Sequence, residues 1–429
     1  MPTGTPRVRE FAATALGKLA RFATRLRGGG SSFPGKLAAR IDPGYLTRAS
    51  GKLPHGVISV LGSNGKTTTT TMLTRMLREH GLRVISNPAG SNMPQGLVTS
   101  MVQATGLSGR VPYDVAVLET DEGYTHELGP QLNPTASLLL NVQVDQLQRL
   151  HEPDKVGDML REMALHTDGH VIINADSPHL VPIADELTHA VPHFFGVDPG
   201  YAATLPHGLS NAADFRGSGS DTQFVLESTV LSSGERSARI RIGDDEIDVA
   251  LPARGLHYAI DVAAAALTAK SVLGDRFDPQ AVVRAMATAK TAFGRGEVMR
   301  VGEEDIEMVM FKNGPSLQLN LDAMPEIPEQ ILFTIDTGTP DLTWLYAADL
   351  SRIERIDVLS GELHAPQLAV FFAYNEIVVD RVEPRMQDAV RAFLALPRPS
   401  RGVKTMFVNY EQMSYIREEL GFHDKEGRA

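Results

Sequence analysis

The sequence contains no cysteine, and this absence excludes several kinds of chemistry. Without thiols the chain can form no disulfide, no thiolate zinc site and no cysteine nucleophile. Aromatic residues are also scarce, at 6%, with Trp344 as the single tryptophan. No uninterrupted apolar run approaches the roughly 18 residues that cross a bilayer, and no secretory signal peptide is recognisable. We therefore expect a cytoplasmic protein that does not span a membrane.

Acidic residues are nearly missing from the first 52 positions. Ten Lys and Arg residues stand there against only Glu10 and Asp42, which gives this segment a net charge of +8. Since the whole chain has a net charge of −11, the remaining residues carry −19. Apolar residues recur in this segment every three or four positions: Val8, Phe11, Ala15, Leu16, Leu19, Phe22 and Leu26. The pattern predicts a basic amphipathic helix. Two interpretations stay open, a helix packed on its own domain or on a partner, and a helix lying on an anionic membrane surface.

The length of 429 residues predicts two or three domains, at roughly 100 to 200 residues each. After a Gly-Ser linker at 28–32, short apolar runs alternate with helical stretches, as in a doubly wound parallel sheet. The strand candidates of this part are 57–61, 82–85, 115–118, 136–140 and 170–173. Residues 201–252 alternate polar and apolar side chains, which predicts a small antiparallel β region inserted at the sheet edge.

A second series of strands and helices follows residue 298 and predicts a separate, Rossmann-like α/β domain. Its strand candidates are 308–311, 331–335, 356–359, 369–372 and 405–409. The sequence thus predicts an α/β protein with three parts: a basic segment at 1–50, a central domain at 51–297 and a C-terminal domain at 298–429.

A glycine-rich loop between the strand at 57–61 and a helix at 68–79 is the strongest functional signal. Its residues are Gly62, Ser63, Asn64, Gly65, Lys66, Thr67 and Thr68. The strict phosphate-loop pattern needs glycine where this chain has Val60, so the match is partial. Backbone N–H groups at a helix start bind anions, Lys66 would contact terminal phosphates, and the Thr67 hydroxyl would help to hold Mg2+. We therefore predict an ATP site with Mg2+, against the alternative of a glycine turn before an ordinary helix.

Two acidic side chains are candidates for holding that Mg2+. Glu119 comes directly after the apolar strand 115–118, and ligands of parallel sheets bind at the carboxyl ends of the strands. Its carboxylate supplies the hard oxygen atoms that Mg2+ requires. Asp145 is the second candidate, in the loop after Asn141. The alternatives are a cap or surface charge for Glu119 and a turn residue for Asp145.

These motifs, taken in order along the chain, resemble the central domain of the Mur peptide ligases. The matching runs are 62–68, 87–93, 117–122, 141–147 and 174–178. The likeness continues through the basic leader, 293–297, Lys312-Asn313 and 341–346, and within the family it is nearest to the ATP-using subunits of lipid II isoglutaminyl synthases. The resemblance implies that Asn141, Arg295 and Lys312 also contribute to nucleotide binding.

The resemblance further implies an amidation carried out by two proteins. In this family ATP phosphorylates the α-carboxylate of D-glutamate in the lipid II stem peptide, and ammonia attacks the acyl phosphate to give D-isoglutamine. The ammonia comes from a separate glutamine amidotransferase subunit of the GatD type, whose Cys acts as the nucleophile. Because this chain has no cysteine, it needs such a partner. Lipid II is membrane-bound, which leaves peripheral binding at the inner face of the membrane as an open possibility.

Asp341 and Lys66 are the residues to which the resemblance assigns catalytic roles. In the family the Asp of an Asp-x-Ser/Thr-Trp motif orients the histidine of the partner subunit, and this chain has Asp341-Leu342-Thr343-Trp344. The alternative for Asp341 is a loop residue that caps the following turn. Trp344 would anchor this loop or the partner interface, and the alternative is an ordinary core residue.

Several departures from the family bear on function. The zinc-ribbon cysteines are missing, so no structural zinc is expected. The Asn-x-x-Asn pair that meets adenine is replaced by Tyr258 and Asp261, and Arg161 stands where amino-acid-adding ligases have a carbamylated lysine. The run before Asp341, usually Ala-Asp-Gly-Arg, is Thr-Gly-Thr-Pro at 337–340. Two alternatives to the amidating subunit therefore stay open: a non-catalytic ATP-binding subunit, and an amino-acid-adding ligase of the Mur or folylpolyglutamate type.

Overall fold

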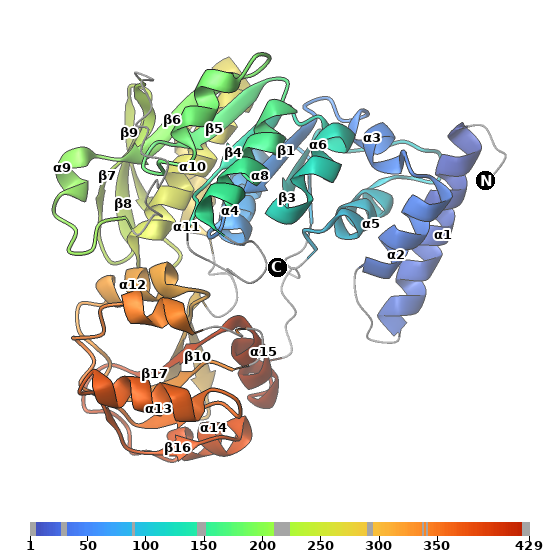
Figure 1. The fold of residues 1–429 in the computed structure, drawn as a ribbon. Coiled ribbons are helices and arrows are strands. Elements are labelled where there is room, and N and C mark those ends of the chain that lie inside the picture. The colour runs from blue at the N-terminus through green and yellow to red at the C-terminus, as the bar shows by residue number, and fades with distance from the viewer. Residues whose placement is uncertain are drawn as a thin grey trace.

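The computed structural model describes residues 6–26, 32–87, 91–143, 152–209, 224–289, 295–336, 339 and 342–422. These residues form two lobes, each built around one main β-sheet with helices on both faces (Figure 1). The first lobe contains everything up to about residue 289, and the second contains the rest.

The sheet of the first lobe has nine strands in the order β2-β3-β1-β4-β5-β6-β7-β8-β9. The strands are β1 (Val57–Leu61), β2 (Val84–Ser86), β3 (Val115–Glu119), β4 (Ala136–Leu139), β5 (His170–Asn174), β6 (Val191–Val197), β7 (Leu226–Ser233), β8 (Ser237–Ile242) and β9 (Asp245–Ala250). Strands β2 to β7 pair in parallel, and β8 and β9 add an antiparallel edge. The predicted antiparallel region therefore continues the main sheet at its edge.

The order of the strands places a topological switch at β1. From β1 the chain goes to the edge strand β2, returns through β3 beside β1, and then continues through β4, β5 and β6 on the other side. Strands β1 and β3 are buried along their whole length, because helices cover both faces of the sheet. In such sheets a ligand crevice lies outside the carboxyl ends of the strands at the switch point. The loop that follows β1 lies at this switch point.

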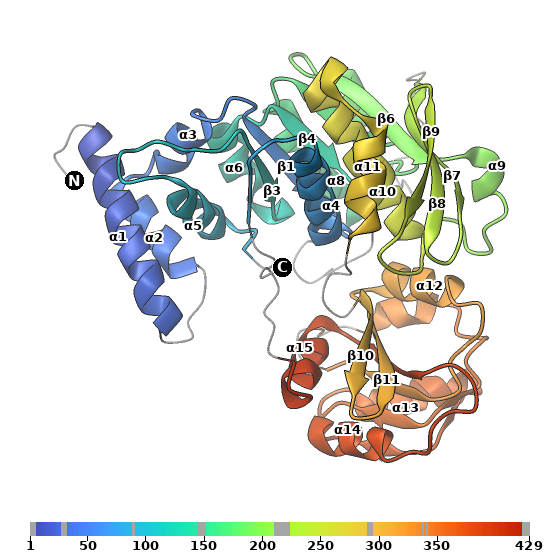
Figure 2. The same cartoon turned by 180° about the vertical axis from the view of Figure 1, so that it is seen from behind.

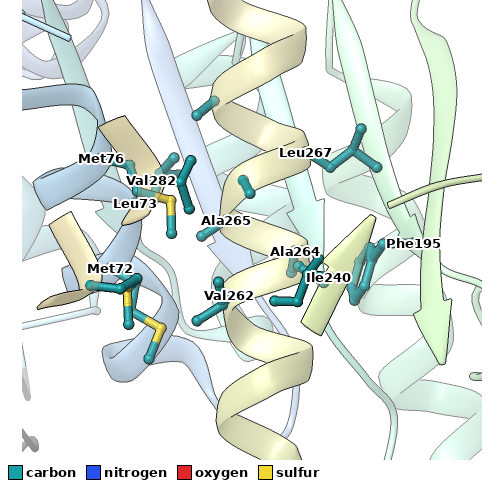
Figure 3. Close-up of a cluster of buried hydrophobic side chains, with 14 of the residues drawn as sticks. Met72, Leu73, Met76, Phe195, Ile240, Val262, Ala264, Ala265, Leu267 and Val282 are labelled. Carbon is teal, nitrogen blue, oxygen red and sulfur yellow. The ribbon is translucent and has the colours of Figure 1, made fainter. Parts of the chain in front are cut away.

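One face of this sheet is covered by α4 (Lys66–Glu79), α10 (Leu256–Leu273) and α11 (Pro279–Ala287). Figure 3 shows their side chains meeting, with Met72 and Met76 of α4 and Val282 of α11 gathered beside the small residues of α10. By length and mean hydropathy, 1.2 over an 18-residue stretch within 256–276, this helical segment could cross a membrane. It is instead the core helix of this lobe, since 67% of that stretch is buried inside the protein.

The other face carries α5 (Pro94–Ala104), α6 (Thr125–Leu132) and α8 (Pro153–Leu165). A layer of N-terminal helices packs outside α5: α1 (Pro6–Leu26), α2 (Ser32–Ile41) and α3 (Tyr45–Ser50). The predicted basic helix is thus α1, which forms one end of the molecule, at the opposite end from β7 to β9 (Figures 1 and 2). Short helical pieces complete the lobe: η1 (Glu122–Tyr124), η2 (Val181–Glu186), α9 (Pro199–Ala202) and η3 (Gly274–Arg276).

The sheet of the second lobe has six strands in the order β10-β11-β17-β12-β14-β16, antiparallel between β10 and β11 and parallel elsewhere. They are β10 (Arg295–Val301), β11 (Glu304–Met310), β12 (Ile331–Thr334), β14 (Val358–Ser360), β16 (Val382–Glu383) and β17 (Lys404–Val408). A small second sheet joins β13 (Arg355–Ile356) and β15 (Val378–Val379). The helices are α12 (Gly314–Asp322), η4 (Thr343–Ala347), α13 (Ala365–Tyr374), α14 (Met386–Leu394) and α15 (Tyr410–Glu419).

One strand prediction in this lobe is wrong. Residues 369–372 were expected to form a strand, but they lie within the helix α13. The run Leu368 to Phe372 is apolar without a clear period, and its buried members pack into the core beside β12 and β14. A short apolar run of this kind does not distinguish a buried strand from a buried helix.

Candidate phosphate-binding site

The loop after β1 is shaped by two glycines with positive φ. Gly62 has φ 142° and Gly65, the residue before α4, has φ 85°. A Cβ atom on Gly62 would lie 2.9 Å from Leu140 Cβ and 3.0 Å from the backbone N of Asn141, and one on Gly65 would lie 2.6 Å from Asp261 Oδ1. Both positions therefore need glycine for space as well as for backbone conformation. The loop directs the first N–H groups of α4 toward the carboxyl end of the sheet, where they can bind an anion.

Lys66, the first residue of α4, is buried and bonded within the loop. Its Nζ donates to the carbonyl oxygen of Gly62 and lies 3.0 Å from Glu122 Oε2. Burial by itself lowers the pKa of Lys66, but the carboxylates of Glu122 and Glu119 outweigh it and raise the pKa. Burial likewise opposes ionisation of Glu122, yet Lys66 and Lys312 lower its pKa. The pair is therefore an ammonium and a carboxylate, and Lys66 is charged at neutral pH.

Thr67 and Glu119 meet beside this ion pair. Thr67 Oγ1 donates to Glu119 Oε2 at 2.8 Å, and Asn92 Nδ2 donates to the other carboxylate oxygen at 3.1 Å. Asn87 holds the backbone of Glu119 from both sides, since its Nδ2 donates to the Glu119 carbonyl and its Oδ1 accepts from the Glu119 N–H, each at 2.9 Å. Asn87 thus fixes the backbone of Glu119, and Thr67 and Asn92 fix the orientation of its carboxylate.

The donor set at this point suits Mg2+. A hydroxyl and a carboxylate are hard oxygen ligands, and Mg2+ is commonly held by one or two such groups together with water and phosphate oxygens. No three His, Cys, Asp or Glu side chains gather into a metal site anywhere in the described part of the chain. A metal ion between Thr67 and Glu119 would accordingly complete its coordination from a nucleotide and from water.

Asn141 fastens the loop to the end of β4. Its Oδ1 accepts from the Asn64 N–H at 2.9 Å and its Nδ2 donates to the Asn64 carbonyl at 3.1 Å, so that the side chain pairs with the loop as a neighbouring strand would. The Asn141 carbonyl also accepts from the Ser63 N–H at 3.0 Å. Gln143 contributes a further bond, from its N–H to Ser63 Oγ at 3.0 Å. The amide of Asn141 therefore holds the loop in shape.

The second lobe reaches the loop through Lys312 and Asn313. Lys312 Nζ donates to the Ser63 carbonyl at 3.3 Å, and Asn64 Nδ2 donates to Asn313 Oδ1 at 3.1 Å. Asn313 is also the N-cap of α12, where its side chain accepts from the Ser316 N–H. Two lysines from different lobes therefore lie against one loop, and this doubled positive charge suits a polyphosphate.

Not every predicted site residue is brought to this cluster. Asp145 and Asp341 lie outside the described residues. The backbone of Arg295 forms the start of β10, and the structure does not describe its side chain. Arg161 lies on α8 and pairs with Glu186, with Nε to Oε1 at 2.8 Å, and this bond raises the pKa of Arg161. It contacts neither Glu119 nor Glu122, so in this arrangement it belongs to a surface ion pair.

The helix α10 approaches the loop with a carboxylate in place of the family's asparagine. Asp261 is 4% exposed and lies next to Gly65, whereas Tyr258 is 2% exposed and its ring contacts that of His257 at a tilt, with ring centroids 4.3 Å apart. Tyr258 is therefore a core residue, whereas Asp261 borders the phosphate loop at Gly65.

Sequence reasoning missed several residues that shape the site. It named no role for Glu122, Asn87, Asn92 or Gln143, although all four lie in runs that carried the family resemblance. Their position in those runs was the one signal in the sequence that could have marked them as site residues. The pattern does not show which of the adjacent acids Glu119, Asp121 and Glu122 turns toward Lys66.

Comparisons with known proteins agree with this geometry. Residues 60–269 match the Mur ligase middle domain. The chain is 25% identical over 386 residues to the MurT subunit of the glutamine-hydrolysing lipid II isoglutaminyl synthase of Streptococcus pneumoniae, a match that covers 80% of this chain and 82% of that subunit. It is a MurT-like protein. The MurT-like chain is also 28% identical over 172 residues to MurT of Staphylococcus aureus strain COL, which is 40% of this chain and 38% of that protein.

Solved structures show that the MurT-like chain has the Mur ligase α/β fold. MurF from Acinetobacter baumannii superposes with a TM-score of 0.67 at 18% identity, over 90% of this chain and 79% of that one. A folylpolyglutamate synthase from Mycobacterium tuberculosis, solved with ADP and AMPPCP, gives a TM-score of 0.64 at 15% identity, over 90% and 93% of the two chains. The predicted fold class is therefore confirmed.

Proposed function

We propose that this MurT-like chain is the ATP-using subunit of an enzyme that amidates the stem peptide of lipid II. The observation that carries the proposal is the cluster of Lys66, Thr67, Glu119 and Lys312 around a glycine loop, in a chain similar to MurT over 80% of its length. A single loop of this kind is found in many ATP-binding proteins. The contribution of Lys312 from the second lobe makes the arrangement that of a two-lobed ligase.

The reaction that we propose has two steps. An oxygen of the D-glutamate α-carboxylate attacks the γ-phosphorus of ATP, which forms an acyl phosphate and releases ADP. Ammonia then attacks the acyl carbon, inorganic phosphate leaves, and the amide of D-isoglutamine remains. A carboxylate resists nucleophiles, so the first step supplies the leaving group that the second needs.

The residues of the chain have distinct parts in this proposal. Lys66 and Lys312 neutralise negative charge on the phosphates as it moves to the leaving group. The loop N–H groups hold the polyphosphate, and Glu122 keeps Lys66 ionised and oriented before ATP arrives. Thr67 and Glu119 would hold Mg2+, which supplies Lewis-acid stabilisation of the same charge.

A second protein supplies the ammonia in this proposal. Glutamine hydrolysis by amidotransferases needs a cysteine nucleophile, and the chain has none. We therefore propose a glutamine amidotransferase of the GatD type as partner, with Asp341 orienting its catalytic histidine. We further propose that the pair works in the cytoplasm.

The test is an amidation assay with lipid II, ATP and Mg2+, with and without the amidotransferase. The proposal expects amidation from ammonium salts by this chain alone and from glutamine only with the partner. The variant Asp341→Asn should lose glutamine-dependent amidation and keep the ammonia-dependent reaction. Asp380→Asn, which alters a surface ion pair with Arg355 in the same lobe, is the control and should keep both.

Other outcomes would reject parts of the proposal. If ammonia supports no amidation and ATP is not consumed, the chain is not the ATP-using subunit. If the product carries an added amino acid in place of an amide, the amino-acid-adding ligase is correct. Equal loss of both reactions in Asp341→Asn would exclude the orienting role.

A further inference from the structure

Helix α1 turns its large apolar side chains to solvent. Val8 is 59% exposed, Phe11 54%, Leu19 62% and Phe22 63%. Successive members are three, eight and three residues apart, which puts them in one row along the helix. An amphipathic helix of a globular protein normally buries such a row, so its exposure over four turns needs an explanation.

The opposite side of α1 is packed tightly, so the exposed row is not the result of a detached helix. Ala13 is fully buried, and Thr14 Oγ1 lies 3.0 Å from Tyr45 Oη in a buried hydrogen bond. Gly17 approaches α5 so closely that an added Cβ would lie 2.9 Å from Val102 Cγ1. If the large apolar residues of α1 were meant to face the core, the small residues Ala13 and Gly17 would not lie on the packed side. The orientation is therefore set by the contact with α2 and α5.

The charge around this row is strongly positive. The two acids of residues 1–52 are both paired within the segment, Glu10 with Lys52 and Asp42 with Arg48. The surplus of +8 is thus carried by the other basic residues, while the rest of the chain is at −19. Arg7 is exposed and lies eleven residues, or about three turns, from Lys18, so both flank the apolar row on one side. On α2, Phe33 is 59% exposed and Lys36 is also exposed.

We propose that α1 binds the surface of an anionic phospholipid bilayer, with Val8, Phe11, Leu19 and Phe22 inserted between the headgroups. An apolar row bordered by cations is what such an interface selects, since the row gains from burial and the cations from the anionic lipid. A purely apolar protein surface would gain nothing from the positive charge of this segment, whereas anionic lipid would. The position of α1 at one end of the molecule leaves the row clear of the second lobe (Figures 1 and 2).

The proposal is tested by sedimentation of the full chain with vesicles, without nucleotide or substrate, so that its outcome is separate from that of the amidation assay. Vesicles of phosphatidylglycerol and phosphatidylcholine should carry the protein down, and vesicles of pure phosphatidylcholine should not. Leu19→Ser combined with Phe22→Ser should weaken binding by at least about tenfold. The control is Val370→Ser with Tyr374→Ser on α13, residues 58% and 86% exposed on the other lobe, which should bind as the wild type does.

A second measurement tests whether the exposed apolar row itself enters the bilayer. Phe22→Trp adds a reporter to a chain whose only tryptophan, Trp344, lies in the second lobe. Its emission should shift to the blue with anionic vesicles, and the shift should fade as salt screens the attraction. Wild-type emission should not change.

Three results would overturn the proposal. One is equal sedimentation of the wild type and the Leu19/Phe22 double variant. Another is binding that does not depend on anionic lipid. The third is self-association of the chain that requires Leu19 and Phe22 while vesicles bind nothing, because the row would then be an interface between two copies.

Discussion

Gly65 sits between the phosphate loop and α4 in the left-handed region, with the Asp261 carboxylate at the place where a side chain would begin. The variant Gly65→Ala should therefore weaken binding of a nonhydrolysable ATP analogue by at least about tenfold, since the loop must move to relieve the contact. Isothermal titration calorimetry measures this change.

The matched control is Gly81→Ala. Gly81 has a similar φ of 84° at the end of α4, but an added Cβ would meet nothing within 4 Å. It should cost about 1 to 2 kcal/mol of stability from the backbone alone and leave nucleotide binding unchanged. Equal loss of binding in the two variants would show that the contact between Asp261 and a side chain at position 65 does not cause the loss of nucleotide affinity.

Asp176, just after β5, gives a prediction about pH. Burial raises its pKa to about 6, although a hydrogen bond from the Val197 N–H opposes the shift. The folded protein thus prefers the protonated acid, so this contribution to stability is present at low pH and is lost as the pH rises toward and through 6. Asp176→Asn keeps the acceptor without the charge and should raise the free energy of unfolding at pH 8 by about 1 to 2 kcal/mol, with little change near pH 4.

Asp114 is the control with the opposite sign. Hydrogen bonds from Arg83 lower its pKa to about 2, so the stability it contributes is present at neutral pH and is lost as the pH falls toward that value. Asp114→Asn should therefore destabilise at pH 7 and have a smaller effect at pH 3. Denaturant titrations at pH 3, 4, 7 and 8 compare the variants, and a fall in stability of Asp176→Asn at pH 8 would contradict the account.

The sequence pattern predicted some residues of the site and missed others. The loop motif and the strand before Glu119 put Thr67 and Glu119 at one edge of a parallel sheet, and the structure brings them within 2.8 Å. The pairing of Glu122 with Lys66 depends on η1, which turns the chain directly after β3. A short turn of this kind leaves no period in the sequence, so Glu122 could not be singled out.

At the scale of elements, strands and helices around the phosphate loop were predictable because their apolar runs are flanked by glycines and polar turns. The run at 369–372 was not, since α13 is apolar without a clear period. The sequence also predicted the helix at α1 but left its orientation open. That orientation depends on where small residues permit close packing, which is visible at Gly17 and Ala13 only in three dimensions.

The segment after α9 contacts the second lobe through His207, which gives a prediction at this scale. Its Nδ1 lies 2.9 Å from Asp322 at the end of α12, and its Nε2 lies 3.0 Å from Asp349, with Gln318 also in reach. Burial lowers the pKa of His207, but Asp322 and Asp349 outweigh it and raise the pKa. The contact is therefore complete below the ordinary histidine pKa and is lost as the pH rises past the raised value.

Hydrogen exchange in α12 should accordingly increase between pH 6 and pH 8.5, once corrected for the intrinsic pH dependence of exchange. His207→Gln should remove that increase. His193→Gln is the control, since His193 is paired with Glu227 inside the first lobe and does not touch the second. If His207→Gln keeps the full pH dependence, the contact does not respond to pH.

At the scale of the whole molecule, the second lobe contacts the phosphate loop of the first. Lys312 and Asn313 contact Ser63 and Asn64, and Arg254 pairs with Glu307 across the same junction. A nucleotide bound at the loop would therefore touch both lobes, which connects phosphate binding to their relative position. The length of the chain predicted two or three domains, and the family resemblance implied a nucleotide-binding role for Lys312. The sequence did not show that Lys312 and Asn313 would contact Ser63 and Asn64.

The central claim is that the loop from Gly62 to Thr68 binds the polyphosphate of ATP with Mg2+ and that Lys66 contributes directly. Calorimetric titration of the full chain with AMPPNP, with and without Mg2+, tests it most directly, using Lys66→Met and, as control, the exposed Lys36→Met. The account predicts one-to-one, Mg2+-dependent binding by the wild type and Lys36→Met. Binding should be at least about 30-fold weaker in Lys66→Met, since a hydrogen bond to a charged group contributes about 2 kcal/mol. Absence of binding by the wild type, or equal affinity in Lys66→Met, would contradict it.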